Sequence, residues 1–175
     1  MKTVMSKYFA RLLEVWRKTD NTLPMTVRLE EAEPFIYVGA ENDDGWIQWR
    51  PIEKAAKHDF TDIETELGAT LHRSIKEYYN SYWFCALAGS YRSRGVSLFP
   101  VVPGLAPGDF VDRLRACKDA HGGKLETVPI GLEANSDLLI VVDNRTGYVF
   151  VEDHERGTFE RLASSLEELI DGLVL

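Results

Sequence analysis

The side chains that could perform catalysis or bind a metal ion are present in this chain, but their spacing does not match the patterns that such chemistry uses. No two histidines lie three or four residues apart, and the two cysteines do not complete a zinc-type spacing. These residues are His58, His72, His121, His154, Cys85 and Cys117. There is no Gly-x-Ser-x-Gly turn to expose a nucleophilic serine, and no glycine-rich loop to hold phosphate. We therefore expect no catalytic residues, no metal site and no cofactor, and we do not expect an enzyme.

Acidic residues, in contrast, are concentrated in two stretches. The segment from Leu29 to Gly45 contains six acids and no lysine or arginine, and a second run of acids without a base lies between Asp59 and Leu71. Two interpretations remain open at this point. The acids form either a solvated surface that aids solubility or an electronegative face that attracts a basic partner and speeds its encounter.

The composition narrows the classes of partner. The chain has 175 residues, and 28 acids against 20 lysines and arginines give a formal net charge of −8. Nucleic-acid-binding proteins normally carry a basic surface, so nucleic acid is not an expected partner. The longest apolar runs are strand-sized and the N-terminal residues lack a secretory signal, so we expect neither a membrane span nor export. Two cysteines without a disulfide or metal pattern fit a reducing cytoplasm.

The first expected element is an amphipathic helix. Its apolar residues recur at steps of three and four, which places them on one helical face. They are Met5, Tyr8, Phe9, Leu12, Val15 and Trp16. We expect the helix to end near Asn21, because Pro24 cannot continue it. The apolar face is interpreted as one that docks on the protein rather than on a membrane.

A β-hairpin is expected next, with strands at Phe35–Ala40 and Trp46–Arg50 on either side of an Asp-Gly turn. Trp46 and Trp49 are three residues apart, so they point to opposite faces of a regular strand. One of the two tryptophans is therefore expected to be exposed.

The stretch from Thr61 to Tyr82 predicts two short helices joined at Gly68, and Thr61 with Glu64 has the spacing of a capping box. The remaining expected elements are strands at Trp83–Ala88, Gly95–Val101, Leu138–Val142 and Tyr148–Glu152, a helix from Asp109, and a last helix capped by Ser165 and Glu168. The pattern predicts an α+β fold in a single domain over residues 1–175. Its sheet is antiparallel or mixed, with helices at both chain ends and a central two-helix segment.

The central two-helix segment resembles the opening motif of the SUKH superfamily. The residues that carry the resemblance are Ile63, Glu66, Leu67, Gly68, Leu71, Ile75, Lys76, Tyr78 and Tyr79. Members of that superfamily typically have a proline where this chain has His72. This departure resembles the Syd branch, the SecY-interacting proteins of Gram-negative bacteria. Further stretches similar to Syd occur in the same order at Phe9, Arg11, Trp16, Leu23-Pro24, Glu33-Pro34, Trp49-Arg50-Pro51, Asp109-Phe110, Arg113-Leu114, Leu162-Ala163 and Ser165-Leu166.

The resemblance implies a SUKH-like fold and a non-enzymatic regulator that is soluble in the cytoplasm and peripheral at the cytosolic face of the bacterial inner membrane. It implies binding to SecY, the channel subunit of the protein-export translocon, through a concave electronegative groove, and action on abnormal or poorly assembled translocons. Cytosolic loops of membrane proteins are rich in lysine and arginine, which an acidic face complements. Direct lipid insertion is not expected, because the anionic leaflet attracts basic segments. The alternative is a SUKH-type immunity protein that binds and neutralises a basic toxin.

The candidate partner-binding residues come from the two acidic stretches and the hairpin. They are Asp43, Asp44, Asp59, Asp62, Glu64 and Glu66, with Trp46 or Trp49 as an aromatic anchor. Binding through exposed charges should weaken with salt, because salt screens them over about 8 Å at physiological ionic strength.

Overall fold

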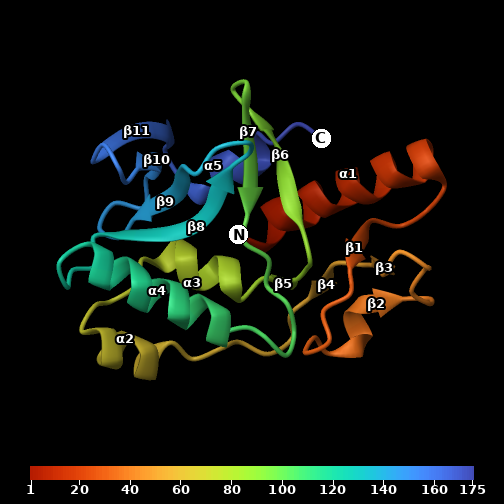
Figure 1. The fold of residues 1–175 in the computed structure, drawn as a ribbon, viewed down its shortest axis with the longest axis horizontal. Helices are drawn as coiled ribbons and strands as arrows, with labels where there is room; N and C mark the ends of the chain where they lie inside the picture. Colours follow the sequence, from red (N-terminus) through yellow and green to blue (C-terminus); the bar gives the residue numbers. More distant parts are fainter.

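The computed structural model describes residues 1–175 (Figure 1). Its elements are α1 (Lys2–Asp20), β1 (Met25–Val27), the 3-10 helix η1 (Pro34–Ile36), β2 (Tyr37–Val38), β3 (Trp46–Trp49), β4 (Ile52–Glu53), α2 (Thr61–Leu67), α3 (Arg73–Tyr79), β5 (Tyr82–Trp83), β6 (Leu87–Tyr91), β7 (Arg94–Leu98), α4 (Gly108–Ala120), β8 (Thr127–Glu133), β9 (Leu139–Asp143), β10 (Val149–Asp153), β11 (Thr158–Ala163) and α5 (Leu166–Asp171). This arrangement confirms the α+β fold class. None of these helices combines the length and the apolar composition needed to cross a bilayer.

The strands form one large sheet and two small ones. The large sheet has six strands in the order β6 to β11, and each strand pairs antiparallel with its neighbour in sequence. A three-stranded sheet has the order β1-β3-β2, and β4 pairs with β5. Figure 1 shows α3 and α4 beneath the large sheet, with the three-stranded sheet at the opposite end of the molecule from β10 and β11.

Helix α1 is amphipathic as expected, and its apolar face joins the main hydrophobic core. Met5, Tyr8, Phe9 and Leu12 are buried there. The Tyr8 hydroxyl donates to the carbonyl of Ala88 at 2.7 Å and accepts from the Ala88 N–H at 2.9 Å, which ties the helix to β6. The helix ends at Asp20, and Asn21 adopts the left-handed conformation that commonly terminates helices.

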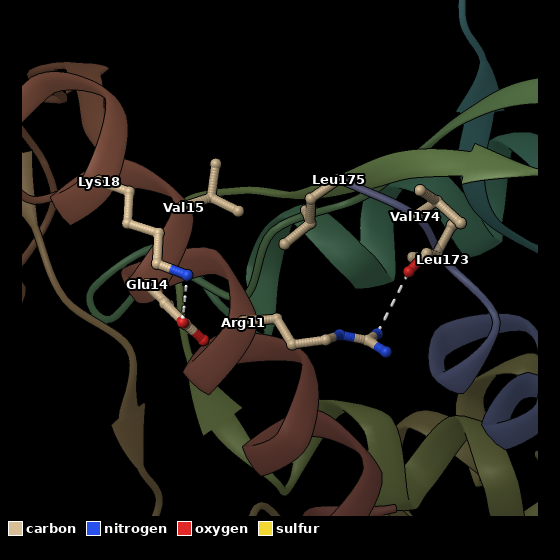
Figure 2. A pocket seen from close by; sticks show the side chains of 7 residues that line it. All are labelled: Arg11, Glu14, Val15, Lys18, Leu173, Val174 and Leu175. Carbon is tan, nitrogen blue, oxygen red and sulfur yellow. Dashed lines mark hydrogen bonds and ion pairs between the residues drawn. The ribbon is translucent and has the colours of Figure 1, made fainter.

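The two ends of the structure are in contact. Helix α1 packs against α5. The Arg11 guanidinium donates to the carbonyl oxygens of Asp171 and Leu173, and Figure 2 shows this side chain reaching toward the C-terminal residues. Val174 then exchanges two backbone hydrogen bonds with Ser90, so the chain end covers part of the otherwise free edge of β6.

Three local predictions require correction. The strand expected at Phe35–Ala40 is shorter, because Pro34–Ile36 form η1 and only Tyr37–Val38 form β2. Thr61 does not cap α2, because Thr61 is the first residue of the helix and the capping position is Phe60, and the Thr61 hydroxyl donates to Asp59 instead. Cys85 lies at a bend between β5 and β6 rather than within a strand, and burial raises the pKa of its thiol to about 12. The cap of α5 is confirmed, because the Ser165 hydroxyl accepts from the N–H of Glu168 at 3.0 Å.

Candidate partner-binding surface

An exposed pair of apolar side chains lies on the outer face of the three-stranded sheet. Val27 on β1 stands opposite Trp46 on β3, and the two are 51% and 44% exposed. Directly opposed residues of paired strands project to the same face. Strand alternation turns Ile47 and Trp49 into the protein. The sheet therefore presents one aromatic and one β-branched residue side by side to solvent.

The β2–β3 turn places two carboxylates next to this pair. The Asn42 side-chain oxygen accepts from the N–H groups of Asp44 and Trp46, at 3.1 and 2.8 Å, and Gly45 takes the positive φ of +81° that the turn requires. Asp43 and Asp44 are consequently held at the exposed tip of the turn, where neither has an ion-pair partner.

The loop after β1 adds further acids to the same region. The Arg28 N–H donates to the Gly45 carbonyl at 3.2 Å, so the loop leaves the sheet beside the turn. Ala32 is buried and the Glu33 N–H donates to Pro103 at 2.8 Å, which fixes the far end of the loop. Between these anchors Glu30 and Glu31 are exposed and have no ion-pair partner.

We name this region the small-sheet surface. It consists of the apolar residues Val27, Leu29 and Trp46 and the acids Glu30, Glu31, Asp43 and Asp44. The nearby Arg28–Glu41 pair is exposed and its atoms are 3.7 Å apart, so it neutralises little of the negative charge. The arrangement suits a partner segment with an apolar side chain flanked by lysine or arginine.

The acids of α2 are largely engaged within the protein. Glu64 accepts from the Leu71 N–H and from the Lys76 ammonium, both at 2.8 Å. Burial opposes ionisation of Glu64, but these two hydrogen bonds outweigh it and lower its pKa. Glu66 is paired with Arg115 at 2.7 Å, and this hydrogen bond lowers the pKa of Glu66.

The six acids proposed from sequence therefore do not form one face. Figure 1 places α2 and the β2–β3 turn at opposite ends of the long axis of the molecule. Asp59 accepts from the hydroxyl and the N–H of Thr61, which lower its pKa, while Asp62 is exposed without an ion-pair partner. Asp43 and Asp44 are the members of the set that stand beside an exposed aromatic residue.

Of the two candidate anchors, only Trp46 is accessible. Trp49 is fully buried, and its ring meets Phe9 edge-on at 6.5 Å between centroids. Trp49 is therefore a core residue rather than a contact for a partner. This agrees with the expectation that the two tryptophans point to opposite faces of the strand.

A second surface groove has a different character. It lies between α1 and the C-terminal residues, has a volume of about 360 Å³, and is lined by Val15, Val174 and Leu175 together with charged side chains (Figure 2). Among the latter, Glu14 is neutralised by Lys18 at 2.7 Å. This groove lacks the excess of acid that marks the small-sheet surface.

The structure also brings together side chains that looked scattered in the sequence. His121 and His154 converge on Glu152 at the end of α4, and Cys117 lies one helical turn before His121. Spacing along the sequence does not reveal this cluster, because its members belong to different elements. The one local signal was Glu152 and His154, two residues apart in a strand-like segment, where they share a side.

Comparison with known proteins gives a consistent result. A model of the family described as "Syd protein (SUKH-2)" matches residues 2–103, which include the whole small-sheet surface. The chain is similar to Protein Syd of Idiomarina loihiensis, with 29% identity over 155 residues that cover 83% of this chain and 81% of the relative. It is 30% identical to Protein Syd of Hahella chejuensis over 136 residues, covering 74% of this chain and 68% of the relative. A match to Protein Syd of Photobacterium profundum, at 24% identity, covers 97% of this chain and 92% of the relative.

Proposed function

The chain belongs to the Syd family, and from this premise we propose that it binds SecY, the channel subunit of the protein-export translocon, through the small-sheet surface. In this role it is a non-catalytic regulator that acts on abnormal or poorly assembled translocons. It is soluble in the cytoplasm and reaches the cytosolic face of the bacterial inner membrane through its protein partner.

The observation that carries the proposal is the exposed Val27–Trp46 pair bordered by acids without partners. Aromatic residues commonly provide most of the binding energy of an interface, and charged residues at its rim set the partner and the rate of encounter. Trp46 supplies the apolar contact, while Asp43 and Asp44 attract lysine and arginine.

The charge of the small-sheet surface also favours a protein partner over lipid. Short cytosolic loops of membrane proteins carry an excess of lysine and arginine. The anionic inner leaflet repels an acidic surface, since it attracts basic segments by about 1 kcal/mol per residue. A basic loop of a membrane protein is therefore the complementary ligand at this location.

The first test is a titration of the full chain against SecY in nanodiscs, with empty nanodiscs measured alongside. We expect saturable binding to the SecY nanodiscs alone, and several-fold weaker binding at about 0.5 M salt, where exposed charges are screened within a few ångströms. Absence of binding to SecY would overturn the proposal. Saturable binding of a basic toxin in its place would support the SUKH-type immunity role, because the same acids suit a basic toxin.

Variants then locate the contact. Trp46→Ala should weaken binding by about 30-fold, the loss of a contact worth roughly 2 kcal/mol. The double change Asp43→Lys and Asp44→Lys should also weaken binding to SecY. The control, Asp59→Lys with Asp62→Lys, makes the same change in net charge at the opposite end of the molecule. It should leave the affinity for SecY within about twofold. If only the second pair weakened binding, SecY would remain the partner and the small-sheet surface would be the wrong site.

A further inference from the structure

We propose that His121, Glu152 and His154 form a binding site for a divalent metal ion of the zinc class, independent of the partner-binding surface. One ligand atom from each of these side chains lies within 4.8 Å of the others. His121 follows the last residue of α4, Glu152 is on β10, and His154 comes directly after that strand. The site thus joins the end of a helix to the sheet.

The hydrogen bonds of His121 prepare its ring for coordination. Its Nδ1 is 2.7 Å from the carbonyl oxygen of Cys117, so Nδ1 carries the proton and donates. The other ring nitrogen, Nε2, faces Oε1 of Glu152 at 2.7 Å, and in the neutral ring it is the atom whose lone pair a metal ion would take. At this distance either a proton or a metal cation joins the two atoms. Metal-bound histidines typically donate their other ring N–H to a carbonyl in this way.

The carboxylate of Glu152 is buried without a full set of hydrogen-bond partners. It is only 2% exposed, and its second oxygen, Oε2, is buried without a hydrogen-bond partner. A buried carboxylate is costly unless a cation and hydrogen bonds compensate for its lost hydration. A proton shared with His121 would satisfy Oε1 alone, whereas a bound divalent ion compensates the charge of the whole carboxylate.

His154 completes a set of two imidazoles and one carboxylate. Its Nδ1 is 3.8 Å from Oε1 of Glu152, and its ring centroid is 5.5 Å from that of His121. The two histidines also line a pocket of about 380 Å³, from which water can supply the remaining ligand. Two histidines, one carboxylate and water form a known type of zinc site, while Mg²⁺ and Ca²⁺ prefer oxygen ligands alone.

The test uses the full chain without a histidine tag, stripped of metal with a chelator and titrated with Zn²⁺ or Co²⁺. We expect one equivalent to bind, with the visible absorption that Co²⁺ shows in a low-coordinate nitrogen and oxygen site, and Zn²⁺ should raise the midpoint of thermal unfolding. His154→Asn should weaken binding more than tenfold and remove the thermal shift. The matched control is Glu155→Gln, which changes an exposed neighbour and should leave binding unchanged.

Because the His154 side chain is 57% exposed, its replacement should leave the fold intact, which circular dichroism would verify. His121→Asn, at the helix end, should reduce affinity in the same manner. Failure of both ions to bind the wild-type chain would overturn the proposal. Undiminished binding by His154→Asn would also overturn it, since it would place the ion elsewhere.

Discussion

The side chain of Lys54 lies in an unusual electrostatic environment. Its side chain is buried, and its ammonium donates to the carbonyl of Tyr79 at 2.8 Å and lies 3.5 Å from the centroid of the Trp83 ring. No carboxylate pairs with it. Burial therefore lowers the pKa of Lys54 from 10.5 to about 8.

This shift predicts a pH dependence with a definite sign. Below pH 8 Lys54 is charged in both the folded and the unfolded chain, so the folded state bears the cost of the buried charge. Between pH 8 and 10.5 the folded chain loses the proton while the unfolded chain keeps it, so the contribution of Lys54 to the free energy of unfolding rises with pH. The rise should be between about 1 and 3 kcal/mol, since the ring of Trp83 offsets part of the burial cost.

The measurement is urea unfolding of the wild type and Lys54→Met at pH 7, 8.5 and 10. Buried Tyr8 and Tyr79, whose pKa values burial raises to about 12, lower stability at high pH in both proteins. The difference between the two curves isolates Lys54 and should grow with pH. Curves that stay parallel would show that Lys54 keeps its ordinary pKa in the folded chain.

At the scale of elements, His72 connects the two-helix segment to the β9–β10 turn. Its backbone N–H donates to the Asn144 side chain at 2.7 Å, and its Nδ1 accepts from the N–H of Ser74, which caps α3. A proline at this position, as in most of the superfamily that the sequence resembles, would lack the N–H that holds Asn144. Gly147 in the turn lies directly against the His72 ring.

This contact predicts different outcomes for two similar substitutions. Gly147 and Gly157 have φ values of +74° and +62°, so alanine should cost about 1 kcal/mol at either position. A Cβ on Gly147 would also overlap the His72 ring, whereas one on Gly157 would meet nothing within 4 Å. Gly147→Ala should therefore lower the free energy of unfolding by about 1–3 kcal/mol more than Gly157→Ala, as measured in urea. Equal losses would mean that the ring moves aside at little cost.

Local patterns predicted the elements whose signals lie within one segment. The periodicity of α1, the Asp-Gly hairpin and the left-handed break at Gly68 all correspond to observed structure. Strand β8 was missed because it contains Pro129 and Gly131, which usually interrupt strands and here coincide with a shift of register. Strand β11 was missed because it is a mostly exposed edge strand without apolar alternation.

The small-sheet surface could likewise be predicted from sequence only where its residues are close together in the chain. Asp43, Asp44 and Trp46 are close in sequence and appear together in the structure. Val27 joins them only through the pairing of β1 with β3, and a three-residue strand carries too little pattern to reveal that pairing. The separation of α2 from the hairpin likewise depends on the tertiary arrangement, which no local charge pattern contains.

At the scale of the whole molecule, the two proposed sites lie far apart. The small-sheet surface and the end of β10 occupy opposite ends of the view in Figure 1. The family match through residue 103 includes the first site and ends before the second. The partner-binding test and the metal-binding test can therefore fail separately, because no residue is shared between them.

The contact between α1 and the C-terminal residues has a consequence for biosynthesis. A ribosome synthesises α1 well before α5 and the carbonyls that Arg11 binds. We expect α1 to reach its full resistance to protease on stalled nascent chains only when residues 166–175 have left the exit tunnel. Full protection of α1 on chains that stop before α5 would contradict this expectation. On the nascent chain the part of α1 that α5 covers therefore stays open until α5 emerges, whereas the part that meets β6 can be covered earlier.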